Sequence, residues 1–216
     1  KEKHSQGLMW EASPAKFASL PFLMAANKNL RDNISVDSSL GEFCDNMFAT
    51  AGKTIYSLLQ LWTDNEKLAG GISNLYKMPL YFELVKTAEQ QIANEPEIVK
   101  ARLRELKAYL HYMSLYYDWA GDQGTNAKTS KAAALCMYLA KINKMQLVNS
   151  YYLISTISRS YAVTTSFYQQ YNVANGTAYQ NGNLPLITAA EVDNDFRNDL
   201  LKFSSTINKY KFETTD

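Results

Sequence analysis

Residues 96–119 carry two apolar stripes at the spacing of a single α-helix. The first stripe consists of Val99, Leu103, Leu106, Leu110, Met113 and Tyr117. The second runs beside it and is aromatic, consisting of Tyr109, Tyr112, Tyr116 and Trp119. Apolar residues at this period mark the helix face that is removed from water, so two adjacent stripes need cover on two sides. The sequence therefore predicts a long central helix, with an aromatic stripe that is covered by other helices or held for a partner.

Capping residues and breaks divide the rest of the chain into further helices. Ser13 and Pro14 are typical of a helix start, and Thr188 with Glu191 forms a capping box. Besides the central segment, the predicted helices cover 13–30, 37 or 38 to a break at 49–52, the stretch from there through 62, 79–94, 130–171 with a break near 143 or 164, and 188–203. The short connection at 94–96 predicts an antiparallel hairpin, in which the leucine stripe packs against 79–94. The tyrosine stripe is then expected to pack against 130–171.

No segment shows the alternation of a β-strand, and 216 residues suffice for one sizeable core. We therefore expect an all-α fold of six or seven helices, packed as successive antiparallel hairpins. Residues 1–12 are expected to be a tail or interdomain segment, 13–204 one helical domain, and 205–216 a C-terminal tail. The chain starts at Lys1 without an initiator methionine or a signal-peptide pattern, so it is expected to be a piece of a longer protein, or else a processed product.

The charge distribution argues against two classes of function. Lysine and arginine total 22 and aspartate and glutamate total 21, which gives a net charge of +1 without a basic cluster. Binding to nucleic acid normally needs such a cluster, so no nucleic-acid partner is expected. The apolar runs fall short of the roughly 20 residues that span a bilayer, so no membrane span is expected either.

The sequence offers little catalytic chemistry. The two histidines, His4 and His111, have no cysteine or second histidine at metal-ligand spacing, so neither a metal site nor a cofactor is expected. The neighbouring carboxylates belong to single helices or their ends, where we expect solvated faces and helix-dipole partners: Glu42 with Asp45, Asp118 with Asp122, and Asp193 with Asp195 and Asp199. Cys44 and Cys136 are expected to be buried free thiols, with one disulfide as the alternative. No catalytic residue is predicted.

Four aromatic residues are candidates for binding a glycan or a neighbouring domain. They are predicted to lie at helix ends or in loops, where a ligand can reach them: Trp10, Trp62, Trp119 and Tyr179. Sugar rings stack on such side chains, whereas packing between helices or docking against another domain is the alternative interpretation.

The stretch FLMAANKNLRDNISVDSSLGEFCDNMFATAGKTIYSLLQLW resembles a pattern that follows the barrel in glycan-active protein families. The matching positions are Asp37, Leu40, Glu42, Phe43, Cys44, Phe48, Ala51, Ile55 and Tyr56, and the later RLRELKAYLHYMSLYYDW is similar to the next helix of that architecture. The chain thus resembles the C-terminal helical region of the gut-bacterial domain-of-unknown-function family 4838, related to alpha-glucuronidases and hexosaminidases. Where that family usually has Tyr-Gly, this chain has Phe48-Ala49.

The resemblance implies a non-catalytic accessory domain that packs on the preceding catalytic barrel of a larger bacterial glycan-processing protein. The parent protein would then be periplasmic or at the cell surface. Its presumed catalytic carboxylates belong to the barrel, so none transfers to this chain.

A second resemblance covers residues 108–142. The segments AYLHYMSLYYDWAGD and SKAAALCMYLAKI are similar to the layout of SusD-like surface glycan-binding proteins. The alternative function is therefore a SusD-like or stand-alone helical glycan-binding module, and the third is a structural protein-interaction bundle.

Overall fold

The computed structural model describes residues 35–63, 77–121, 125–161 and 186–211. Seven α-helices occupy most of them: α2 (Val36–Phe48), α3 (Gly52–Thr63), α4 (Met78–Gln91), α5 (Glu97–Gly121), α6 (Thr125–Ile142), α7 (Ser150–Tyr161) and α9 (Ala189–Lys211). Two 3₁₀ turns, η2 (Ala49–Ala51) and η4 (Asn143–Met145), follow α2 and α6. These residues contain no strand, so the predicted all-α class is confirmed. The helix predicted at 13–30 lies outside the described residues.

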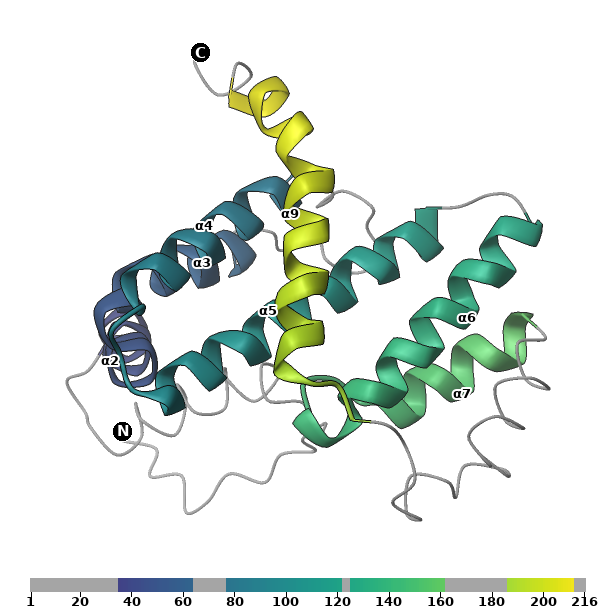
Figure 1. Ribbon diagram of the computed structural model, residues 1–216, viewed down its shortest axis with the longest axis horizontal. Coiled ribbons are helices and arrows are strands. Elements are labelled where there is room, and N and C mark those ends of the chain that lie inside the picture. The colour runs from purple at the N-terminus through teal and green to yellow at the C-terminus, as the bar shows by residue number, and fades with distance from the viewer. Residues whose placement is uncertain (1–34, 64–76, 122–124, 162–185, 212–216) are drawn as a thin grey trace, which may run out of the picture.

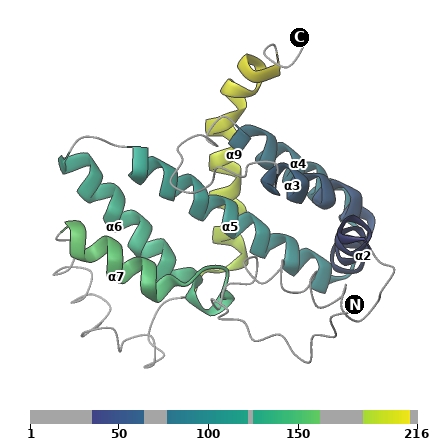
Figure 2. The same cartoon turned by 180° about the vertical axis from the view of Figure 1, so that it is seen from behind.

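Helix α5 is the central element, as its two stripes predict (Figure 1). Helices α2, α3 and α4 lie beside one half of it. Helix α6 lies beside the other half, and α7 packs against α6, as is also visible from behind (Figure 2). From α2 through α7, each α-helix contacts the next one along the chain. Helix α9 departs from the succession of hairpins, because it crosses α5 steeply and contacts both α4 and α5.

The first core lies between α2, α3, α4, α9 and one face of α5. The leucine stripe of α5 is buried there as predicted, except that Met113 is only partly buried. Phe82 of α4 stacks on Phe196 and Phe203 of α9, with ring centroids 5.3 and 5.2 Å apart. Burying rings of this size is worth several kcal/mol in total, so these contacts hold α9 on the bundle.

The second core lies on the other side of α5 and includes residues of α6, α7 and the start of α9. The tyrosine stripe packs against it, and its rings follow one another at centroid distances of 5.8 Å (Tyr109–Tyr112), 6.0 Å (Tyr112–Tyr116) and 5.5 Å (Tyr116–Trp119). Burial raises the pKa of Tyr109 to about 12. The predicted packing of this stripe against the helix that follows α5 is confirmed.

The fourfold spacing of Leu80, Leu84, Ala88 and Ile92 predicts one apolar face for α4, of which Ala88 and Ile92 are buried in the first core. Leu80 and Leu84 are only partly buried and line an open groove of about 440 Å³ beside α3, whereas Phe82 and Val85 are fully buried. Helix α4 has apolar residues on both faces. The face that carries Phe82 is enclosed between α3, α5 and α9. Fourfold spacing alone does not distinguish the two faces.

Several helix ends differ from the predicted ones. Helix α2 is capped by Ser35, whose hydroxyl accepts a hydrogen bond from the Ser38 amide at 3.0 Å, and not by residue 37 or 38. Helix α6 starts at Thr125, ahead of the predicted start at 130, and the predicted break near 143 is present as η4. Helix α9 starts after Thr188 as predicted but continues to Lys211, because nothing after residue 203 breaks it.

The turn between α2 and α3 is strained at Ala49, which has φ 47° and ψ −119°. Its amide donates to the carbonyl of Asp45, and Arg102 of α5 donates to the carbonyl of Met47 at 3.1 Å. A Cβ on Gly52 would lie 2.8 Å from the Cα of Asp45, so this position requires glycine. The turn is therefore fixed by close backbone contact, and Ala49 adopts a conformation that glycine adopts without strain.

Candidate functional site

Charged and polar side chains meet where α9 crosses the other helices, and we call this region the α9 junction. Its members come from four helices: Glu89 (α4), Arg104, Lys107, His111, Ser114 and Asp118 (α5), Tyr138 and Lys141 (α6), and Glu191, Asp193, Asp195, Asp199 and Lys202 (α9). The expectation that the carboxylates of α9 form a solvated face is wrong, because they point at cations and donors on α5 and α6.

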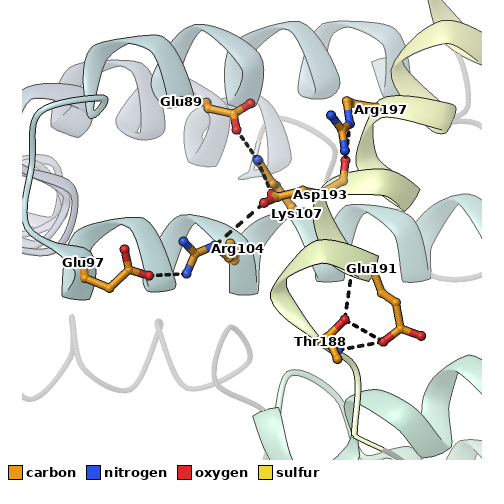
Figure 3. A network of polar contacts seen from close by, with 8 residues as sticks. All are labelled: Glu89, Glu97, Arg104, Lys107, Thr188, Glu191, Asp193 and Arg197. Carbon is orange, nitrogen blue, oxygen red and sulfur yellow. Dashed lines mark hydrogen bonds and ion pairs between the residues drawn. The ribbon is translucent and has the colours of Figure 1, made fainter.

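Lys107 is the most deeply buried cation of the junction, with 2% of its side chain exposed. Its ammonium donates to Glu89 Oε1 at 2.5 Å and to Asp193 Oδ1 at 2.7 Å (Figure 3). It also lies 5.0 Å from the ring centroid of Phe196. Two carboxylates and an aromatic face replace the water that a buried ammonium loses. Lys107 therefore links α4 to α9 through α5.

His111 and Ser114, one turn apart on α5, share a single carboxylate on α9. His111 Nδ1 lies 2.7 Å from Asp199 Oδ2, and the Ser114 hydroxyl donates to Asp199 Oδ1 at 3.1 Å. Asp199 is buried, and the rings of His111 and Tyr138 meet in a T-shaped arrangement with their centroids 4.6 Å apart. His111, which the sequence predicts as a residue on the flank of its helix, therefore binds a carboxylate of another helix.

Three further ion pairs surround these contacts. Lys202 donates to Asp118 at 2.6 Å, Lys141 to Glu191 at 2.8 Å, and Arg104 to Glu97. The hydrogen bond from Lys141, together with those from the Thr188 amide and hydroxyl, lowers the pKa of Glu191 to about 2. The Thr188 bonds are the predicted capping box, which is confirmed (Figure 3).

A small pocket of about 220 Å³ opens beside Lys107. Its charged lining consists of Glu89, Lys100, Arg104, Lys107 and Asp193, above an apolar floor. Four of these five side chains pair with one another across the pocket. Their hydrogen-bonding capacity is directed within the protein, so the pocket is part of the junction's ion-pair network.

The geometry does not activate a nucleophile. A histidine that serves as general base accepts a proton from a serine, but here His111 and Ser114 both bind Asp199 and not each other. Burial raises the pKa of the thiols of Cys44 and Cys136 to about 12, so both remain protonated near neutral pH. Both cysteines are free, as predicted. Among the described residues no group of three or more histidine, cysteine or acidic side chains is arranged to hold a metal ion.

Of the four aromatic candidates, only the side chain of Trp119 can be placed. It lies near the end of α5, is partly buried against the second core, and meets the Tyr116 ring edge-on at 5.5 Å. Trp62 belongs to α3, but its side chain lies outside the described part of the structure, as do Trp10 and Tyr179 altogether.

Sequence reasoning missed the junction because its partners are far apart along the chain. Lys107 and Asp193 are 86 residues apart, and His111 and Asp199 are 88 residues apart. One signal was present: Lys107 lies within the apolar arc of its helix, between Leu106 and Leu110. A cation in that place needs a buried anionic partner.

No protein-family profile, curated protein or solved structure matches this chain. Across the described helices, none combines the length and the apolar character needed to cross a bilayer. The fold and the junction thus define an all-α protein in which the charged side chains of one crossing connect the helices.

Proposed function

We propose that this chain is a non-catalytic helical accessory domain of a larger bacterial glycan-processing protein, and that it packs on the catalytic barrel of that protein. The observation that carries the non-catalytic part is the α9 junction. Its buried and half-buried charges bind one another, as in a structural ion network, and the serine and histidine there do not form a nucleophile–base pair. The larger protein that contains this domain would be periplasmic or at the cell surface.

The turn at Ala49 supports the glycan-processing part. The family that the chain resembles usually has glycine where this chain has Ala49, and Ala49 has a positive φ of 47°. A position that favours glycine is thus found where the family pattern places one.

The first test is the coding region upstream of Lys1. A barrel-sized region in the same reading frame is expected, and a lipoprotein signal directly before Lys1 would refute the proposal. The upstream region and this chain, produced as two separate polypeptides, should then form a stable complex on size-exclusion chromatography. Failure to associate, with both parts folded, would also contradict the proposed packing.

The second test separates an accessory domain from an enzyme and from a binding module. The purified chain should release no product from chromogenic glycosides or polysaccharides. Titration with oligosaccharides should leave its tryptophan fluorescence unchanged, whereas a saturable change would favour a glycan-binding module. Trp119→Phe serves as the matched variant, because a change that depends on Trp119 places the ligand at the end of α5.

A further inference from the structure

Ion pairs between helices are concentrated on α9. Within the described part of the chain, the pairs that join a lysine or arginine of one helix to a carboxylate of another all involve α9, apart from Lys107–Glu89. The pairs of α9 are Arg104–Asp193 at 3.9 Å, Lys107–Asp193 at 2.7 Å, Lys141–Glu191 at 2.8 Å and Lys202–Asp118 at 2.6 Å. They bind roughly three turns of α9 to α5 and α6.

The other described helices contact one another mainly through apolar side chains. Two of the hydrogen bonds that join them are between uncharged groups. Thr54 of α3 donates to the side-chain oxygen of Gln91 at 2.8 Å, and Tyr138 of α6 donates to the carbonyl of Ala108 at 3.1 Å. The attachment of α9 therefore relies on opposite charges to a greater extent than the contacts among these helices do.

Most of the charges that hold α9 are in reach of dissolved ions. The side chains of Lys202 and Asp118 are 43% and 41% exposed, and those of Lys141 and Glu191 are 32% and 42% exposed. Salt screens such pairs, because the Debye length falls from about 30 Å at 0.01 M to about 3 Å at 1 M ionic strength. Each exposed pair contributes little, so the effect of salt on α9 is a sum over several pairs. The buried ammonium of Lys107 is screened less.

Helix α9 can loosen while the contacts among the other helices persist. It follows the other described helices and packs across α4 and α5, whereas α2 to α7 contact their neighbours in sequence. Segments attached in this way open as cooperative units, at a smaller free-energy cost than global unfolding. Phe196 and Phe203 still stack on Phe82 when the ion pairs are weakened, so salt increases the population of the open state without releasing the helix altogether.

We propose that α9 is an electrostatic strap, whose attachment to α5 and α6 is controlled by ionic strength. At low ionic strength its ion pairs hold it closed over α4 and α5, and at high ionic strength it opens more often. Each opening uncovers the Phe82 ring and the Lys107 ammonium, which are buried in the attached state. This inference does not depend on the proposed function.

Hydrogen exchange of the whole chain at constant pH, followed by mass spectrometry and corrected for intrinsic rates, tests the proposal. Between about 0.01 and 1 M sodium chloride, the protection factors of residues 189–204 should fall roughly fivefold relative to those of α3. The double variant Lys141→Gln with Lys202→Gln removes two half-exposed pairs and should reduce this fall to roughly twofold. Equal protection of α9 at both salt concentrations, or the full dependence in the double variant, would overturn the proposal.

Glu83→Gln is the matched control, because it breaks a pair of similar exposure, Lys86–Glu83, that lies within α4. This variant should retain the salt dependence of α9, and its loss there would also count against the proposal. A further pair of variants keeps the proposal testable if the double variant does not fold. Asp118→Lys places two ammonium groups together and should diminish the salt dependence, whereas Asp118→Lys combined with Lys202→Asp reverses the pair and should restore it. An unchanged dependence in D118K would refute the strap.

Discussion

Replacing Ala49 by glycine should stabilise this protein, although glycine substitutions usually destabilise. Ala49 has φ 47° and ψ −119°, a conformation in which a Cβ is strained and glycine is not. Its amide hydrogen bond to Asp45 is made by the backbone, so Ala49→Gly preserves it. The substitution therefore removes strain without removing a polar contact.

The magnitude follows from three opposing contributions. Backbone strain of this kind amounts to about 1–3 kcal/mol, which the substitution relieves. The greater freedom of glycine in the unfolded chain costs about 0.5–1 kcal/mol. Loss of a half-buried methyl group costs a further ~0.4 kcal/mol, half the value for full burial. The net expectation is a gain of about 1 kcal/mol, or about 2–4 °C in Tm for a chain of this size.

Thermal unfolding followed by circular dichroism, with urea unfolding at constant m-value, measures this gain. Ala134→Gly is the matched control, because Ala134 is exposed in the interior of α6 and should lose about 1 kcal/mol. Ala49→Val should destabilise, since a β-branched side chain tolerates positive φ poorly. A loss of stability in A49G equal to that in A134G would refute the strain argument.

Three other outcomes are expected. Lys107→Ala should lower the free energy of unfolding by about 2 kcal/mol. This loss is smaller than the ~3–5 kcal/mol expected when a fully buried ion pair is broken, because Glu89 and Asp193 stay partly hydrated. A urea unfolding curve identical to that of the wild type would contradict this prediction. Burial raises the pKa of the thiols of Cys44 and Cys136 to about 12. Both thiols should therefore not react with iodoacetamide in the native protein at about pH 8, but should react in urea. Rapid labelling of the native protein would show that they are accessible. Hydrogen bonds lower the pKa of Glu191 to about 2, so its ionised carboxylate stabilises the fold above the ordinary glutamate pKa, and this stabilisation is lost as the pH falls toward 2. The Tm difference between wild type and Glu191→Gln should therefore shrink over that pH interval. A constant difference would argue against the capping contribution.

The elements of this fold were largely predictable, because each depends on neighbours in the sequence. The two stripes of α5 predicted cover on two sides, and the capping box at Thr188 predicted the start of α9. The buried face of α4 was not predictable from period alone, since Phe82 and Leu84 lie on different faces of one helix and both are apolar. What decides between them is the position of α9, which is a property of the tertiary fold.

The polar site was not predictable for a related reason. Carboxylates on an isolated helix are most stable in water, so Asp193 and Asp199 were interpreted as solvated. Asp199 is buried and Asp193 half-buried because donors and cations on α5, such as Lys107, lie close to them only after the chain has folded. The spacing of residues along one helix contains no information on such a partner.

The position of α9 after the other described helices also determines the order in which these helices can assemble during synthesis. Helices α2 to α7 contact their neighbours in sequence, so each contact can form as soon as the next helix emerges. Lys107 and Phe82 must wait for residues of α9, which is synthesised after all the other described helices. Until then Lys107 lacks one of its two carboxylates and the Phe82 ring lacks its stacking partners. A nascent chain that stalls before α9 therefore exposes both a hydrated cation and an apolar surface, which makes it a substrate for chaperones or for aggregation.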